Sequence, residues 1–444
     1  MAFNLIRNAR MFFTTNVDVN TGVVKATGFT ASNTKEIQVL DGLSFSQATG
    51  TETVTVNEAG TDPARGQRQF NTSLEPVELT FSTYMRPYFT EGSTNSAALD
   101  ADDVIDAEED VLWNAMYAGY INGTDELIAT TSRTPAGAGT WPASGQGSGA
   151  AWYQVNGTGA VAPYSVVSVS KSAKNQLQKF GVIIVLDASS YVIDNCVLDQ
   201  ATIDFGLDAI ATIAWTARGS TLRSAAITAT STPVSGAITL SGTIADPVTS
   251  TQTTIGATQA AKAKNTTAPF LANKLSSVTL QAYTSSPSYG SGGAPSGTSY
   301  NLALTGGSIT LSNNVTYLTP ANLGVVNKPF TYFTGTRAIS GTINCYLKTG
   351  TNNSADLINT MLANSSSDIE PDFKLVLHIG GSSTSATRVT LNIPAAVLSI
   401  PTINTEQVVS QTINFTAQGT GASAFDLEEE NEITINYYSA NTTV

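Results

Sequence analysis

The sequence carries one strand-like segment twice. Residues 211–219 read ATIAWTARG and residues 411–419 read QTINFTAQG, so six of nine positions are identical or exchange one aromatic ring for another. The segments before each of them also follow in the same order. Residues 273–419 therefore form a second copy of the preceding half. A chain built this way is expected to fold as two similar domains in tandem.

Each copy is expected to contain strands, a long loop, strands again, a short helix and closing strands. In the first copy the strands are expected over 3–15, 36–47, 51–58, 77–82, 181–187, 191–205 and 208–218. In the second copy they are expected over 273–285, 300–318, 333–347 and 373–380, with residues 304–309 aligned on residues 40–45. The chain is thus predicted to be mainly β.

Residues 77–82 show the clearest strand alternation. Val77, Leu79 and Phe81 are apolar and predicted to face a core. Polar residues stand between them, at Glu78, Thr80 and Ser82. Successive side chains of a strand point to opposite faces, so the polar set is predicted to share one face.

One helix is expected in each copy. The first is predicted over about 102–117, because carboxylates favour a helix start and apolar residues recur at helical spacing. Its predicted buried stripe is Val104, Ala107, Val111, Leu112 and Ala115. The second helix is predicted over 354–362. Its predicted buried residues are Leu357, Ile358, Met361 and Leu362.

Two stretches lie outside this repeated pattern. Residues 130–160, with Trp141 and Trp152, are expected to be a surface loop inserted in the first domain. Residues 220–270 are rich in Thr, Ser and Ala and are expected to connect the copies, in part packed and with a possible edge strand over 236–244. The predicted domains are 1–219 and 271–444. Within the second, the acidic tail and the strand 433–438 are expected either to cross to a neighbouring subunit or to form a frayed edge.

The sequence predicts no catalytic, metal or cofactor site. The single histidine, His378, lies in an apolar strand, and no CxxC, HExxH, GxSxG or Walker pattern occurs. Cys196 and Cys345 are interpreted as small core residues rather than as a disulfide. The net charge of −13 does not suit a protein that wraps nucleic acid. No signal peptide or transmembrane helix is expected.

Several segments resemble the major tail tube proteins of long-tailed, non-contractile phages, in particular the internally duplicated proteins of T5-like siphophages. In the first copy the similar segments are 5–12 (LIRNARMF), 55–60 (TVNEAG), Pro63, 65–66 (RG), 70–71 (FN) and 81–84 (FSTY). In the second copy they are 313–320 (NNVTYLTP) and 400–403 (IPTI). Some members carry an immunoglobulin-like decoration domain after the second copy, and none is expected within residues 1–444.

The resemblance implies two tandem tail-tube-fold domains, each an antiparallel β-sandwich or partial barrel with a flanking helix. Three chains would form a ring with pseudo-sixfold symmetry and a large β-barrel lumen, and rings would stack head-to-tail into a tube that conducts double-stranded DNA. The implied partners are further copies of the chain, a tape measure protein, a tail-tip initiator and a tail terminator. DNA would pass without specific binding. The implied location is the virion tail, after assembly in the host bacterial cytoplasm.

Candidate surface residues follow from alternation and loop position. The lumen-facing candidates are Glu52, Glu78, Thr80, Ser82 and Thr342. The candidates for contacts between rings or subunits are Glu58, Arg65 and Arg68. Two alternatives stay open: a β-sandwich adhesin or tail decoration module, suggested by Trp141 and Trp152, and the inner tube of a contractile or secretion apparatus.

Overall fold

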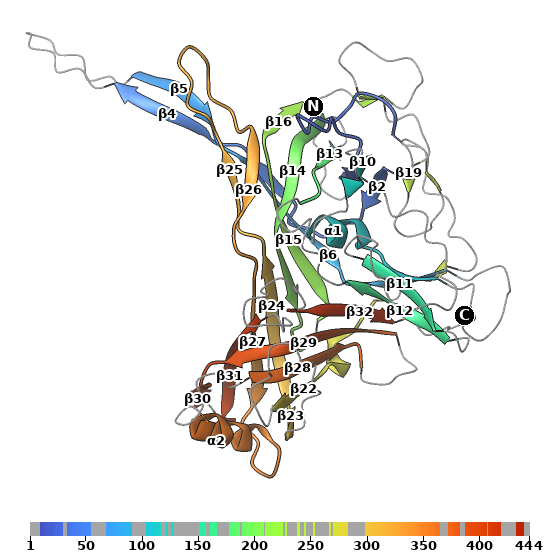
Figure 1. Ribbon diagram of the computed structural model, residues 1–444, viewed down its shortest axis with the longest axis vertical. Helices are drawn as coiled ribbons and strands as arrows, with labels where there is room; N and C mark the ends of the chain where they lie inside the picture. Colours follow the sequence, from blue (N-terminus) through green and yellow to red (C-terminus); the bar gives the residue numbers. More distant parts are fainter. Residues whose placement is uncertain are drawn as a thin grey trace, which may run out of the picture.

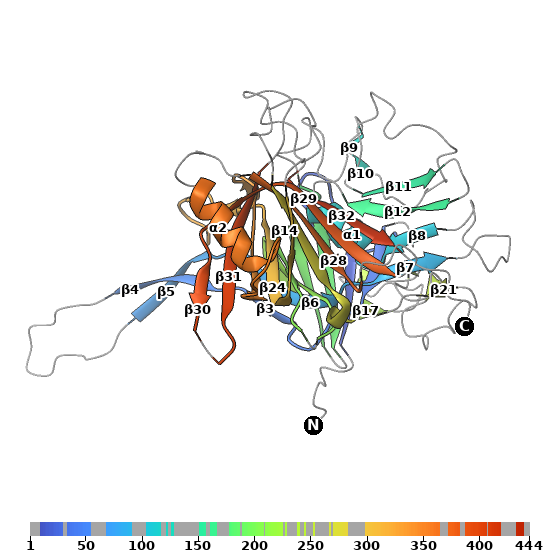
Figure 2. The ribbon, with the colours of Figure 1, turned by 90° about the horizontal axis from the view of Figure 1, so that it is seen from below.

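The computed structural model describes most of both predicted copies. The described residues are 9–29, 33–54, 68–90, 104–116, 121–122, 126–127, 151–156, 160–166, 177–186, 189–207, 209–224, 227–228, 238–239, 244–245, 252–253, 266–267, 270–282, 298–364, 372–381, 387–405, 407–418 and 432–438. The protein is mainly β, with strands arranged in layers; one short α-helix, α2 (Ser354–Asn364), lies at one end of the molecule and the other, α1 (Asp110–Met116), lies among the strands (Figures 1 and 2).

The first copy forms two sheets that share one long strand. Its main strands are β1 (Arg10–Thr14), β2 (Thr34–Ile37), β3 (Ser44–Ser46), β6 (Val77–Tyr84), β13 (Phe180–Leu186), β14 (Ser189–Asp204), β15 (Thr212–Gly219) and β16 (Thr221–Ser224). One sheet joins β2, β1, β13, the first half of β14 and β16. The other joins β3, β6, β15 and the second half of β14. A hairpin of β4 (Thr49–Val54) and β5 (Arg68–Leu74) projects from this copy (Figure 1).

The second copy repeats this arrangement. Its strands are β22 (Ser277–Ala282), β23 (Ser299–Leu302), β24 (Leu304–Ser312), β25 (Val315–Leu318), β26 (Thr331–Thr334), β27 (Ala338–Tyr346), β28 (Asp372–Ile379), β29 (Arg388–Leu398), β30 (Thr402–Asn404) and β31 (Ser410–Gln418). One sheet joins β23, β22, β28 and β29, and the other joins β24, β27, β31 and the end of β29. A 3₁₀ turn, η2 (Asn273–Leu275), precedes β22.

The pairings of the two copies correspond one to one. In the first copy the strand pairs are β1–β2, β1–β13, β13–β14, β14–β15, β15–β6, β6–β3 and β4–β5. Their counterparts in the second copy, in the same order, are β22–β23, β22–β28, β28–β29, β29–β31, β31–β27, β27–β24 and β25–β26. The repeated order of elements in the sequence is therefore also a repeated topology. The pairing corrects the alignment of the copies by two residues, since Ser44 lies opposite Thr80 as Thr310 lies opposite Ser340.

The two copies are joined edge to edge by a pair of antiparallel strands. The second half of β14 pairs with β24, from Gln200 opposite Ser312 to Asp204 opposite Ser308. One sheet thus runs through β3, β6, β15, β14, β24, β27, β31 and the terminal edge formed by β29 and β30. We call it the shared sheet, and we call the β14–β24 junction the internal seam.

The helices differ in how well the sequence predicts them. In the second copy α2 (Ser354–Asn364) forms as expected and buries Leu357 and Met361, although Leu362 is about half exposed. In the first copy α1 spans only Asp110–Met116, so the predicted helix over about 102–117 is wrong for residues 104–109. Val104–Ala107 is strand β8, because it pairs with β7 (Pro87–Thr90).

The insertions contain more paired backbone than expected. Residues 151–156, predicted as loop, form β11 (Ala151–Asn156), which pairs with β12 (Ala160–Val166), whereas Trp141 lies outside the described residues. The remaining short strands are β9 (Ile121–Asn122), β10 (Glu126–Leu127), β17 (Ile227–Thr228), β18 (Ile238–Thr239), β19 (Ile244–Ala245), β20 (Gln252–Thr253) and β21 (Thr266–Thr267). Part of 220–270 therefore packs, with β19 on the edge of β2 and β20 beside β19.

The last described strand ties the second copy to the first. Strand β32 (Thr434–Tyr438) lies between β29 and β12, so neither alternative for residues 433–438 is correct. Tyr437 is fully buried, accepts a hydrogen bond of 2.8 Å from Trp113 Nε1 of α1 and donates one to Glu109. Trp113 in turn packs edge-on against Trp215 of β15 at 4.9 Å. The core is thus continuous across both copies.

Candidate assembly surfaces

The shared sheet has one polar face that crosses both copies. Residues directly opposite one another point to the same side of a sheet, so the strand register defines this face. One row runs across it through Ser82, Ala214, Thr202, Thr310, Ser340 and Thr416. The opposite face is apolar and buried, with Leu79, Trp215, Ile309 and Phe415 among its residues. We call the first side the polar face.

Four of the five predicted lumen residues lie on the polar face. Glu78, Thr80 and Ser82 alternate with buried Val77, Leu79 and Phe81, which confirms the predicted alternation. Thr342 lies on the same face, opposite Ser308 and Asn414. Glu52 lies elsewhere, on the projecting β4–β5 hairpin opposite Phe70.

The polar face carries few charges. Glu78 lies opposite Arg218, and Arg218 Nε donates to Asp199 Oδ2 at 2.9 Å. Asp204 is exposed at the end of β14. Most other positions in the rows hold Thr, Ser, Asn or Gln. Such a face offers hydroxyl and amide groups rather than cations to whatever lies against it.

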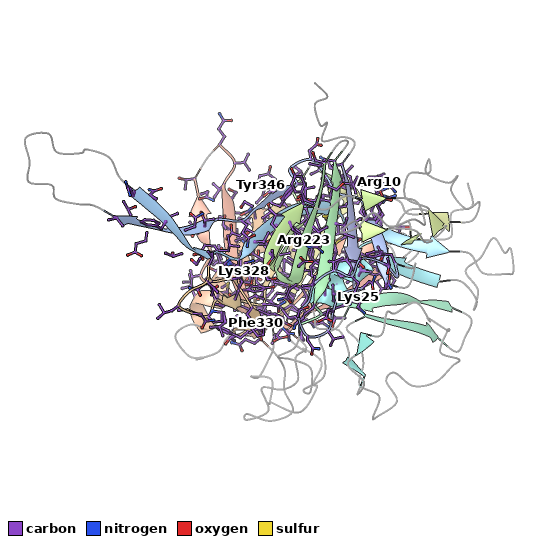
Figure 3. All side chains as sticks on the ribbon, turned by 90° about the horizontal axis from the view of Figure 1, so that it is seen from above. Arg10, Lys25, Arg223, Lys328, Phe330 and Tyr346 are labelled. Atoms are coloured by element: carbon purple, nitrogen blue, oxygen red, sulfur yellow. The ribbon has the colours of Figure 1, made fainter. Side chains whose placement is uncertain are left out.

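The predicted contact residues belong to the β4–β5 hairpin. Arg68 begins β5 and is exposed, whereas Glu58 and Arg65 lie outside the described residues. Thr53 and Val54 are both exposed, so the hairpin does not cover a core with either face here. Figure 3 shows the hairpin extending well beyond the body of the molecule, with Lys328 near its base.

A second surface, which the sequence reasoning did not single out, is the loop 319–330 between β25 and β26. Several of its apolar side chains are exposed, namely Leu323, Val325, Val326 and Phe330. The loop contacts the other hairpin, because Leu74 N donates to Asn327 O at 2.8 Å and Asn327 N donates to Thr72 O at 3.1 Å. An apolar loop exposed this way is typical of a protein contact surface.

The shared sheet ends in two unpaired edges among the described residues. At one end β3 pairs only with β6, and at the other β30 pairs only with β31. Ile400 and Ile403 on the second edge are 55% and 47% exposed. Unpaired strand edges with apolar side chains invite pairing with another chain.

The internal seam shows what pairing does to such edges. Along it, Ile203 of β14 is 0% exposed, and Phe205, which directly follows β14, is 3% exposed. Ile309 and Leu311 of β24 are 0% and 1% exposed. Thr202 Oγ1 and Thr310 Oγ1 lie 3.1 Å apart on the polar face.

Hydrogen bonds of buried polar groups stabilise the end of the internal seam. Asp199 sits in a bulge of β14, and its Oδ1 accepts a 2.7 Å hydrogen bond from Val315 N. Asn313 donates to the carbonyl oxygens of Met116 at 2.8 Å and Leu198 at 3.2 Å. Hydrogen bonds of this kind are costly to lose because they leave buried donors or acceptors unsatisfied.

The carboxyl of Glu109, buried beside α1, has a strongly altered pKa. Burial raises the pKa of Glu109 to about 8, although the hydrogen bond from Tyr437 opposes the shift. Its Oε2 has no hydrogen-bond partner, which suits a protonated acid. A small pocket nearby is lined by Gln38, Tyr84, Arg86 and Glu108, and Arg86 Nη1 lies 2.9 Å from Glu108 Oε2. We interpret Glu109 and the residues of this pocket as structural groups that pack between β6 and α1.

The described residues show no cluster of three or more His, Cys, Asp or Glu suited to a metal ion. His378 Nδ1 lies 2.9 Å from Thr390 Oγ1, within a β-sheet. Cys196 and Cys345 are free and buried, which confirms their interpretation as core residues. In the described part of the chain, no helix is both long enough and apolar enough to cross a membrane.

Comparison with known proteins finds one similar tail protein. No family model matches the chain. The chain is 26% identical over 427 residues to the tail tube protein pb6 of Escherichia phage T5, in an alignment that covers 94% of this chain and 73% of pb6. This alignment includes most of both copies, and the mainly β fold agrees with it. The match supports the resemblance of this chain to the tail tube proteins of T5-like phages, and pb6 is by its name a structural tail protein.

Proposed function

We propose that three copies of this chain close into a ring with pseudo-sixfold symmetry, and that such rings stack into the tube of a phage tail. The observation that carries this proposal is the internal seam, where two equivalent four-stranded units already stand side by side in one sheet. Three chains would supply about 24 strands, enough for a barrel with an open channel. The proposed domains are residues 1–219 and 271–444, connected by residues 220–270.

The polar face is proposed to line the channel through which double-stranded DNA passes. Thr80, Ser82 and Thr342 would present hydroxyl groups to the DNA, and Glu78 would present a carboxylate. Lys and Arg side chains on this face would bind the DNA phosphates and release their counterions, and this binding would hold the DNA in place. A hydroxyl-rich face with few cations lets the duplex pass without specific binding.

Rings are proposed to stack head-to-tail through the two projecting hairpins. The β4–β5 hairpin, with Arg68, is equivalent to the β25–β26 hairpin, which carries the exposed apolar loop 319–330, and the two hairpins contact each other. Head-to-tail contacts between unlike surfaces do not close, so they produce a filament. Glu58 and Arg65 are retained as candidate contact residues of the first hairpin.

The wider assembly follows from the resemblance to this family. A tape measure protein would occupy the channel before DNA, a tail-tip initiator would begin the tube and a terminator would end it. Assembly would take place in the host bacterial cytoplasm. The adhesin alternative depended on exposed tryptophans in a loop, and Trp152 instead lies in β11, in a paired strand.

Electron microscopy of the purified chain, combined with mass measurement in solution, tests the proposal. The expected result is a three-chain ring, or hollow tubes with three chains in each layer. A chain that stays monomeric at high concentration, or rings with another number of copies, would contradict it.

A further inference from the structure

The two unpaired edges of the shared sheet correspond to the two strands of the internal seam. Residues of β3 and β24 share their positions relative to the next strand, so Leu43, Ser44 and Phe45 are equivalent to Ile309, Thr310 and Leu311. At the other end Leu398 lies opposite Phe415 as Ala201 lies opposite Trp215. The end of β29 is therefore equivalent to the second half of β14, and Ser399 is equivalent to Thr202.

From this equivalence we propose that the β29–β30 edge of one chain pairs antiparallel with β3 of the next chain, with Ser399 opposite Ser44 and Leu398 opposite Phe45. The occupant of each edge is a second copy of this chain. This register repeats the internal seam from Ala201 onward across the chain boundary, because Val397, the equivalent of Gln200, is already paired with Asp372 of β28. It rests on the ring of the proposed function.

The exposure of side chains supports this register. The apolar residues that the internal seam buries have exposed or half-buried equivalents at the free edges. Asp204 and Thr402 are equivalent, because they lie opposite Thr212 and Thr412. The residues that follow them, Phe205 and Ile403, are therefore equivalent too, but Phe205 is 3% exposed and Ile403 is 47% exposed. Leu43 and Phe45 are half-buried, although their equivalents Ile309 and Leu311 are fully buried. A partner strand on each edge would restore the burial that the first copy already has.

The proposed seam differs from the internal seam in two respects. The bulge that holds Asp199 is absent from β29, since Ala396 and Val397 pair with consecutive residues of β31. The position equivalent to Asn313 is Gln47, whose side chain already bonds Leu222 N at 2.9 Å and Ser220 O at 3.1 Å. The seam between chains therefore lacks the hydrogen bonds from Asp199 and Asn313 that lock the internal one.

Disulfide cross-linking tests the register. The variant Ser44→Cys/Ser399→Cys is expected to form disulfides between chains under mild oxidation, because directly opposed strand residues bring their Cβ atoms within disulfide reach. The ladder of cross-linked products on a non-reducing gel is expected to end at three chains. Thr202→Cys/Thr310→Cys is the matched control at the internal seam, and it is expected to link within one chain only.

A shifted pair distinguishes register from mere proximity. In Ser44→Cys/Asn404→Cys the second cysteine lies several residues further along the edge, more than 10 Å from Ser44 in the proposed register by the rise of a strand. It is expected to give less than a tenth of the cross-linked product. Rings or tubes that form normally but link through the shifted pair, or not at all, would overturn the register and leave the proposed function standing. Absence of both assembly and cross-links would overturn the two together.

Discussion

Thr202 and Thr310 face each other across the internal seam, with their hydroxyl oxygens 3.1 Å apart. They belong to different copies of the repeated unit, and the pairing of β14 with β24 places them in one row of the polar face. This one contact bears on three features of the protein. It joins the two copies into a single sheet, it places hydroxyl groups on the candidate channel surface, and it supplies the pattern for contacts between chains.

The first prediction concerns the free edge. Ile403→Asp is expected to abolish ring and tube formation, because a carboxylate would be buried unpaired when the next chain covers the edge. The thermal midpoint of the monomer should change little, since the side chain is about half exposed. Light scattering and electron microscopy measure the assembly.

The matched control is the equivalent residue at the internal seam. Phe205→Asp buries a charge inside every chain and is expected to unfold or strongly destabilise it. Normal tubes from Ile403→Asp would show that this edge is not an interface.

The second prediction concerns the internal seam. Asp199→Ala removes the acceptor of Val315 N and the partner of Arg218, and is expected to lower the free energy of unfolding by about 1–3 kcal/mol. Asp199→Asn keeps an acceptor oxygen and should cost less. Urea unfolding followed by tryptophan fluorescence measures both variants, and equal losses would show that the hydrogen bond to Val315 contributes little.

The third prediction compares two glutamates. Glu78→Lys is expected to make assembled tubes retain a short DNA duplex at low salt, with retention falling steeply as salt rises. Glu52→Lys has the same change of charge on the projecting hairpin and is expected to leave DNA retention in the channel unchanged. Cosedimentation of labelled duplex with tubes reports retention, and the opposite ranking would place Glu52 on the channel side.

The fourth prediction concerns stacking. Leu323→Ser/Val325→Ser removes exposed apolar surface from loop 319–330 and is expected to leave rings intact while shortening or preventing tubes. Particle lengths in negative stain measure the effect. Val19→Ser, at an exposed residue outside the hairpins, is the control, and tubes of normal length from the double variant would exclude the loop from stacking.

The fifth prediction concerns pH. The pKa of Glu109 rises from 4.5 in a solvated chain to about 8 in the fold, so the folded state binds a proton more tightly than the unfolded state. Its contribution to stability is greatest below pH 4.5 and falls as pH rises toward 8, by roughly 1 kcal/mol for each pH unit. Glu109→Gln mimics the protonated acid and is expected to remove this loss.

Urea midpoints at pH 5 and pH 8 test the fifth prediction. The advantage of Glu109→Gln over the unsubstituted chain should grow from the lower to the higher pH. Asp41→Asn removes a carboxyl group from an exposed turn and is the variant used for comparison. A constant difference between Glu109→Gln and the unsubstituted chain would show that Glu109 does not titrate in this range.

The sequence predicted the elements that depend on local pattern. The alternation of β6 and the position of α2 follow from periodicities that each segment carries by itself. The prediction of a helix at Val104–Ala107 was wrong, because the spacing of its apolar residues fits a helix whereas pairing with β7 makes the segment a strand. Tertiary contacts override local propensity in such short segments.

Contacts between distant parts of the chain could not be predicted from the local sequence pattern. Nothing local indicates that β14 would pair with β24 or that β32 would lie between β29 and β12. The two-residue correction at β3 arises in the same way, because strand register is set by neighbours. Alternation defines a face of a strand, so it predicted that Glu78, Thr80 and Ser82 share one face, as they do. Alternation does not indicate which sheet a strand joins, and Glu52 lies on a hairpin that belongs to another sheet.

The burial of Tyr437 by α1 has a mechanical consequence. Strand β32 comes from the end of the second copy and is held in the first, so the two copies are fastened at this strand as well as at the internal seam. Such a chain resists bending between its halves. In a ring of three chains, flexibility would concentrate at three boundaries rather than six. A tube of this protein is therefore expected to deform with threefold compliance, despite the near-sixfold appearance of its wall.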